Sequence, residues 1–229
     1  MKSKMIGKIT VDLGMTILLM LLMAFELIGR TAHEWIGAGM FVLFILHHIL
    51  NKKWTRNLFH GRYTPYRVLQ TASVGLVFLT MVCLMVSAVL ISREVFSFLP
   101  IRGGRSLGRM LHLICSYWGF LLFSFHLGLH WNMIMGMARQ LCAKQSRLRA
   151  WLLRLAGVLI AVYGLYAMFR RDIPNYLFMQ TQFVFFDFEE PLVFFFLDYL
   201  AVMGLFVFAG YYAGKAVRKS PKNSKGTKL

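Results

Sequence analysis

The sequence predicts an all-α fold, a polytopic membrane helical bundle. Of its 229 residues 58% are hydrophobic, and the mean hydropathy is +0.60, which is too apolar for an ordinary soluble domain. Six apolar runs, each long enough to cross a bilayer as a helix, follow one another along the chain. The net charge of +17 comes from short basic clusters between these runs, as membrane topology predicts. We therefore expect a lipid bilayer, and no nucleic acid, as a partner.

The first hairpin of spans lies at the N-terminus. Residues 9–28 form an apolar run that is longer than the core of a signal peptide, contains Asp12 and Glu26, and is followed by no A-x-A cleavage site, so it predicts a membrane helix. The second span opens at the sequence TAHE, a capping-box pattern with Thr31 at the N-cap. It ends at Asn51, and a basic connection with the turn sequence YTPY leads to about Arg67.

A second hairpin completes a predicted four-helix core. Its spans cover residues 68–91 and 109–131, joined by a loop with two glycines and with Ser106 as a candidate N-cap. We place the core at residues 1–136 and a basic cytoplasmic loop at residues 137–150. The three cysteines form no C-x-x-C pair, which argues against a disulfide framework, a zinc site or an iron–sulfur site.

Two further spans follow in the region 151–214. They cover about residues 151–169 and 192–214, and between them lies an aromatic segment, residues 173–191, that ends in acidic residues. That composition suits an extracytoplasmic stretch at the membrane interface. The basic tail, residues 215–229, has no hydrophobic periodicity and is predicted to be disordered.

The distribution of basic residues predicts the orientation. With a cytoplasmic N-terminus, 19 of the Lys and Arg residues lie on the cytoplasmic side and 7 outside. The positive-inside rule therefore predicts a multi-pass protein of the cytoplasmic membrane with both termini in the cytoplasm. The second and fourth spans then run in the same direction.

Four histidines within these two parallel spans are the main functional signal. His33 and His47 are fourteen residues apart, and so are His112 and His126. This spacing puts each pair on one helix face, about 21 Å apart along the axis. Two helices with matched histidine pairs can hold two planar cofactors, and haem is the cofactor that imidazole binds in this way. We therefore predict two b-type haems, an outer one between His33 and His112 and an inner one between His47 and His126, with a depth offset of about 6 Å at the outer pair.

Other residues are candidates for supporting roles. His48 and His130 are alternative ligands, because His130 lies one helical turn from His126. Glycines leave room for a macrocycle between helices, and four lie at suitable depths: Gly14, Gly29, Gly75 and Gly119. Cations for the haem propionates are available near both surfaces: Arg30, Arg105, Arg109, Lys52, Lys53 and Arg56.

Acidic residues suggest further roles. Asp12 and Asp198 lie in apolar spans and are candidate proton carriers, although Asp12 could also complement a helix N-terminus. Asp187, Glu189 and Glu190 offer an outer docking surface. A donor such as quinol at the inner end and a redox partner at the outer end would complete an electron path, and the residues leave open whether the chain acts as a quinol-oxidising enzyme subunit.

Several sequence segments resemble a known family. HEWIGAG, LHHILNKKW, FHLGLHW and YLFMQTQFVFFDFEEP are similar to segments of the flavinylation-associated membrane cytochromes, first described only as a domain of unknown function. The likeness covers the core to about His130 and continues through the acidic aromatic segment. It implies a cytochrome-b-like four-helix core that serves extracytosolic FMN-bearing or other redox proteins, with four matching haem ligands: His33, His47, His112 and His126.

Two other functional classes compete with an electron carrier. A metal-ion transporter would use the histidines to bind zinc, but zinc needs several ligands around one ion, and histidines about 21 Å apart on a helix cannot share it. Only His126 and His130 could, as an i, i+4 pair. A cofactor-free structural protein would leave the membrane histidines without a role.

Overall fold

The computed structural model describes residues 2–101, 103–141 and 146–219, and within these ranges the chain forms helices and no strands. Six helices are long and apolar enough to cross a membrane, which confirms the predicted all-α polytopic bundle. The helices are α1 (Lys2–Met23), α2 (Phe25–Leu50), α3 (Lys52–Arg56), α4 (Pro65–Ile91), α5 (Arg105–Leu141), α6 (Arg147–Arg170), α7 (Ile173–Leu177) and α8 (Leu192–Lys219).

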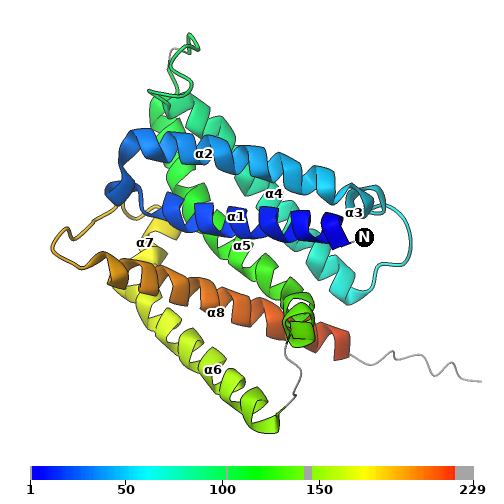
Figure 1. Cartoon of the computed structure of the whole chain (residues 1–229). Helices are drawn as coiled ribbons and strands as arrows, with labels where there is room; N and C mark the ends of the chain where they lie inside the picture. The colour runs from blue at the N-terminus through cyan, green and yellow to red at the C-terminus, as the bar shows by residue number, and fades with distance from the viewer. Residues whose placement is uncertain (1, 102, 142–145, 220–229) are drawn as a thin grey trace, which may run out of the picture.

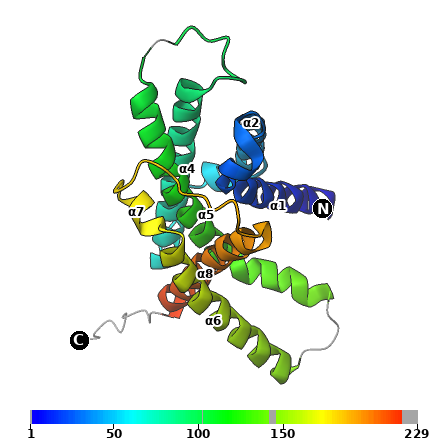
Figure 2. The ribbon, with the colours of Figure 1, turned by 90° about the vertical axis from the view of Figure 1, so that its left-hand side faces the viewer.

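The long helices pack mainly as neighbouring pairs. α1 packs along α2, α4 packs along α5, and α8 lies against both α5 and α6. α6 lies at the edge of the bundle opposite α2, as both views of the ribbon show (Figure 1, Figure 2). The α1–α2 hairpin and the α4–α5 hairpin approach each other less closely than the members of each pair do. We therefore expect space for a cofactor between these two hairpins.

Glycines bring the last two spans into close contact with the core. A Cβ atom added to Gly128 of α5 would collide with the carbonyl oxygen of Val207 of α8, and one added to Gly210 would collide with that of Phe125. Small residues let membrane helices approach at the backbone, where van der Waals packing holds them together. α8 is therefore an integral part of the bundle around α5.

The turn between α1 and α2 differs from the sequence prediction. α1 ends at Met23, before the predicted Ile28, and the chain breaks again at Gly29, whose φ of 74° is not helical. Only glycine adopts such an angle at little cost. The predicted capping box at Thr31 does not form, because Glu34, its acidic member, has other partners. The Glu34 carboxylate accepts hydrogen bonds from Ser92 and from backbone N–H groups of the turn after α4. A distant turn with several free N–H groups outcompetes the single N–H of a capping box.

Both ends of the described chain lie at one end of the bundle, here called the terminal end (Figure 1). Lys8 near the start of α1 donates a hydrogen bond to Asn51 after α2 (2.8 Å). The guanidinium of Arg218, near the end of α8, lies 3.8 Å from the ring centroid of Tyr66 at the start of α4. The opposite end, formed by the α4–α5 loop and residues 173–191, is here called the cavity end.

The predicted interfacial segment at the cavity end is partly core. Ile173, Tyr176 and Leu177 of α7 are buried, and the Tyr176 ring stacks on that of Tyr117 in α5 with centroids 4.7 Å apart. The indole N–H of Trp118 donates to the carbonyl oxygen of Leu177 (3.0 Å). α7 therefore covers α5 with its apolar side chains, and the position of residues 173–191 at the membrane interface stays a prediction.

Two predicted boundaries also move. α5 continues to Leu141 and α6 begins at Arg147, so the predicted basic loop 137–150 is partly helical, and residues 142–145 lie outside the described residues. α8 continues to Lys219, so the tail predicted to be disordered from residue 215 is helical for its first five positions. Its remainder, residues 220–229, also lies outside the described residues.

Candidate cofactor site

A cavity of about 760 Å³ opens at the cavity end between α1, α2, α4 and α5, with residues 173–191 along its rim. Pockets for small molecules and cofactors commonly have volumes of about 300–1,000 Å³. Small residues from three helices line it, among them Gly37, Ala88 and Gly119. The cavity is therefore large enough for an organic cofactor.

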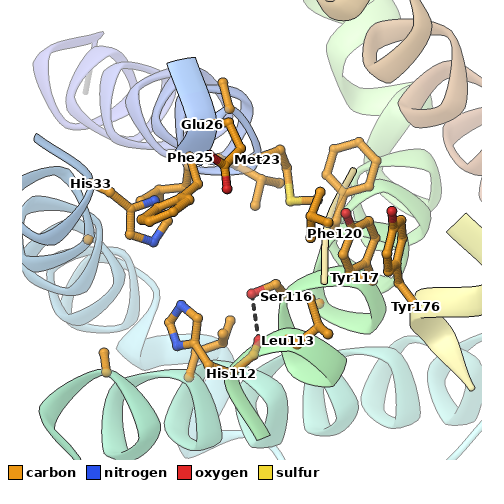
Figure 3. Close-up of a pocket in the computed structure, with 18 of the residues that line it drawn as sticks. Met23, Phe25, Glu26, His33, His112, Leu113, Ser116, Tyr117, Phe120 and Tyr176 are labelled. Atoms are coloured by element: carbon orange, nitrogen blue, oxygen red, sulfur yellow. Dashed lines mark hydrogen bonds between the residues drawn. The ribbon is translucent and has the colours of Figure 1, made fainter. Parts of the chain in front are cut away.

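His33 and His112 face each other across this cavity (Figure 3). Their ring centroids are 6.0 Å apart, with the ring planes at 67°. Two imidazoles on opposite sides of one metal ion, with bonds of about 2.0–2.1 Å, would have centroids about 6 to 6.5 Å apart. The observed separation fits two ligands of one metal, so the depth offset expected between these two histidines does not keep their rings apart.

A buried hydroxyl orients His112. The Ser87 side chain is fully buried, donates to the carbonyl oxygen of Leu84 (2.9 Å), and has its Oγ 3.1 Å from Nδ1 of His112. Because the hydroxyl proton of Ser87 is donated to the Leu84 carbonyl oxygen, Oγ accepts a hydrogen bond from the Nδ1–H of His112. The Nε2 lone pair is then left for a ligand, as in other metal-binding histidines.

Glu34 holds the helical turn that carries His33. Its carboxylate accepts a hydrogen bond from the Ser92 hydroxyl (2.6 Å) and three more, each of 3.0 Å, from the backbone N–H groups of residues 93–95. These bonds tie α2 to the turn after α4. The neighbouring His33 has a buried Nδ1 with no hydrogen-bond partner in the described part of the chain, and its ring packs edge-on against Phe25, with centroids 5.1 Å apart.

Cations surround the mouth of the cavity. Arg30, Arg105 and Arg109, named from the sequence as propionate partners, all line it. Guanidinium groups bind carboxylates through charge-assisted, often bidentate hydrogen bonds. The donor set thus suits a planar cofactor with a metal at its centre and carboxylates at its edge, and haem b has these features.

The histidines at the terminal end are arranged differently. Nδ1 of His47 lies 2.7 Å from a carboxylate oxygen of Asp12, and the amide nitrogen of Asn51 lies 3.4 Å from its Nε2. The ring centroids of His126 and His130 are 4.8 Å apart. The structure therefore gathers these groups at one end and leaves open whether His126 or His130 would pair with His47.

His48 lies beside this group, with its ring centroid 5.6 Å from that of His47. Its ring packs against Phe44 of its own helix and Phe78 of α4, with centroids 4.4 and 5.4 Å apart. Its Nδ1 is buried without a hydrogen-bond partner in the described part of the chain, and its role as an alternative ligand stays a prediction.

The four candidate glycines have different environments. Gly119 lines the cavity and packs against Leu84 and Thr80 of α4. Gly14 packs on Leu43 of α2, Gly29 forms the kink between α1 and α2, and Gly75 has open space around it. Gly29 is not among the residues that line the cavity, whereas Gly37 of α2, which the sequence did not single out, lines it.

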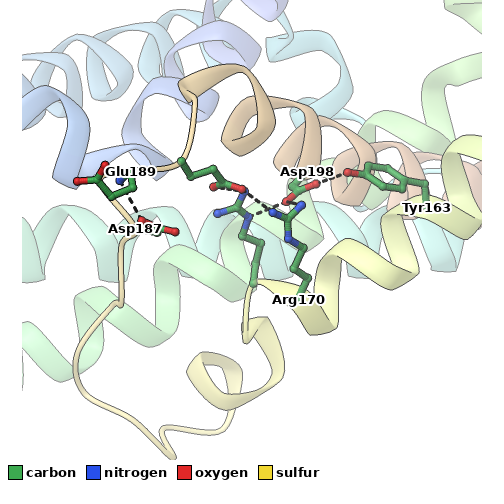
Figure 4. Close-up of polar contacts among 7 residues, drawn as sticks. Tyr163, Arg170, Asp187, Glu189 and Asp198 are labelled. Atoms are coloured by element: carbon green, nitrogen blue, oxygen red, sulfur yellow. Dashed lines mark hydrogen bonds and ion pairs between the residues drawn. The ribbon is translucent and has the colours of Figure 1, made fainter.

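Asp198 and Glu190 belong to a cluster of ion pairs, here called the Arg–acid cluster (Figure 4). The fully buried Asp198 accepts hydrogen bonds from Tyr163 (2.6 Å) and Arg171 (2.8 Å) and pairs with Arg170 (3.3 Å). Glu190 pairs with both arginines at 2.6 Å. Burial alone lowers the pKa of Arg171, but its hydrogen bonds to the two carboxylates raise it above the ordinary value.

This cluster corrects two interpretations of acidic residues. Asp198 is engaged by three partners and is not placed as a proton carrier. The Glu190 side chain is only 10% exposed, so it cannot belong to an exposed docking surface, whereas Asp187 and Glu189 are exposed. No signal in the sequence indicated that Glu190, at the end of the aromatic segment, would form ion pairs with Arg170 and Arg171 at the C-terminal end of α6.

No group of three or more His, Cys, Asp or Glu side chains that could hold a metal ion occurs among the described residues. The two-histidine arrangement at the cavity end is what a metal within a macrocycle requires, since the macrocycle supplies the other four ligands. Comparisons of the chain with protein families, with characterised proteins and with solved structures found no match.

Proposed function

We propose that this chain is a membrane b-type di-haem cytochrome that carries electrons across the cytoplasmic membrane, from quinol or another donor to an extracytosolic flavin-bearing partner. The observation that carries the proposal is the pair His33 and His112, whose ring centroids lie 6.0 Å apart across the cavity. Three arginines, Arg30, Arg105 and Arg109, line the same cavity. Bound haem would supply reversible one-electron transfer.

The residues around the cavity have distinct roles in this proposal. His33 of α2 and His112 of α5 would hold the iron. Ser87 keeps the Nε2 atom of His112 free of a proton by accepting from Nδ1. Arg30, Arg105 and Arg109 would bind the cofactor carboxylates, and apolar lining residues such as Phe120 and Met81 would exclude water and lower the local dielectric constant.

A second haem would lie toward the terminal end, held by His47 and by His126 or His130. The helical rise puts the two ligand rows about 21 Å apart, and together the two sites span most of a hydrocarbon core of about 30 Å. Asp12 accepts from Nδ1 of His47, so the Nε2 of His47 carries no proton, and it could bind iron in place of its 3.4 Å contact with the Asn51 amide.

The proposed orientation puts the terminal end in the cytoplasm, because the basic residues gather there. The cavity end then faces outward, and its exposed carboxylates, Asp187 and Glu189, offer a docking surface to a redox partner with complementary positive charge.

Topology reporters test this orientation. Fusions after Lys53 and Lys144 are expected to report a cytoplasmic location, and a fusion after Gly103 an external one, because inversion would move 19 basic residues outward. An internal location for Gly103 would overturn the assignment of the cavity end to the outer surface.

Visible spectroscopy tests the cofactor. The purified protein, oxidised and then reduced with dithionite, is expected to show the absorption bands of b-type haem, with about two haems per chain by pyridine haemochrome assay. Metal analysis of the same sample separates the alternative: zinc in place of iron, with no haem bands, would support a metal-ion transporter and contradict the proposal.

A further inference from the structure

The two ends of the bundle differ in the group that accepts a hydrogen bond from a candidate ligand histidine. At the terminal end, a charged carboxylate of Asp12 lies 2.7 Å from Nδ1 of His47. At the cavity end, the neutral hydroxyl of Ser87 lies 3.1 Å from Nδ1 of His112. The other candidate ligands, His33 and His126, have buried Nδ1 atoms with no partner in the described part of the chain.

The acceptor on Nδ1 changes the electronic character of the ligand. A carboxylate draws the Nδ1 proton toward itself and makes Nε2 more electron-rich, whereas a neutral hydroxyl does so much less. An electron-rich axial ligand stabilises the oxidised iron and lowers its reduction potential. The shorter hydrogen bond and the negative charge are both found at the terminal end, so both would lower the reduction potential of the haem there.

Other charges do not cancel this difference. The arginines at the cavity mouth would be neutralised by the propionates they bind, and the carboxylate of Glu34 is already held by four donors. At the terminal end, the nearby cation Lys8 donates its hydrogen bond to the Asn51 amide, and Arg218 lies over the Tyr66 ring. Neither of these two cations forms an ion pair with Asp12 in the described structure.

We infer that Asp12 is a positioning residue that gives the terminal-end haem the lower reduction potential, so that electrons run downhill from the terminal end to the cavity end. This inference rests on the proposed function. A quinol-class donor would lose two electrons, one at a time, and release two protons to water at the terminal end. Each electron would pass to the cavity-end site and then to a flavin-class acceptor, with no bond made or broken in the transfer between the two sites.

Potentiometric titration of the full-length protein tests the inference. The variant His112→Ala retains the terminal-end haem alone and identifies its midpoint. In the wild-type protein this midpoint is expected to be the lower of the two. Asp12→Asn is expected to raise it while leaving the cavity-end midpoint in place, because the amide keeps the shape and loses the charge. Asp12→Glu, which restores the carboxylate, is expected to bring it back toward the wild-type value.

Matched outcomes separate the possible failures. Glu94→Gln removes an exposed carboxylate in the turn after α4, at the other end of the bundle and outside the cavity lining, and is expected to shift neither midpoint. A terminal-end midpoint above that of the cavity end in the wild type, or one that Asp12→Asn leaves unchanged at full haem content, overturns the inference and leaves the proposed function standing. The wild-type comparison decides the matter even if Asp12→Asn loses haem. A wild-type protein without haem bands overturns both.

Discussion

His112→Ala is expected to remove about half of the haem bound per chain, because one of two proposed sites loses a ligand. His33→Ala is expected to do the same, since the two rings face one cavity. The measurement is haem per protein by pyridine haemochrome assay, together with the reduced-minus-oxidised spectrum.

A histidine outside the membrane provides the control for these variants. His60 is exposed in the loop after α3, so His60→Ala should keep the full haem content. Retention of all haem in both His33→Ala and His112→Ala would rule out the cavity-end pair. Complete loss from either variant would show a single site, or two sites that fold together.

Asp198→Ala is expected to lower the free energy of unfolding by about 3–5 kcal/mol, the usual cost of removing one partner from a buried ion pair. Asp198 has no exposed surface, and its carboxylate accepts from Tyr163 and Arg171. Without it the largely buried guanidinium of Arg171 would keep only Glu190. Denaturant unfolding in detergent, followed by tryptophan fluorescence, measures the change.

The exposed carboxylate Glu189 provides the comparison for that experiment. Glu189→Ala is expected to change the free energy of unfolding by less than about 0.5 kcal/mol, as exposed substitutions usually do. The haem spectrum of Asp198→Ala should match that of the wild type once the protein is folded, because Asp198 itself does not line the cavity, whereas the cluster members Arg170, Arg171 and Glu190 do. Equal stabilities for the two variants would show that the cluster contributes little.

The number of spans and the pairing of histidines by depth follow from local features of the chain. Hydropathy over about 20 residues is enough to mark a membrane helix, and the fourteen-residue spacing determines which histidines share a helix face. The even number of spans likewise predicts that both ends of the chain meet at one end of the bundle, where the structure places Lys8 and Arg218.

The partners of each polar group could not be predicted in this way. Ser87 and His112 are 25 positions apart, and Asp12 and His47 are 35 apart, so their contacts depend on how helices rotate and tilt against one another. The same is true of Glu190, which looked like a surface acid and is paired with the arginines at the end of α6. The sequence by itself determined the helices and the faces they present. Only the tertiary structure decided which faces meet, because close packing and the pairing of buried polar groups are satisfied between helices and not within one.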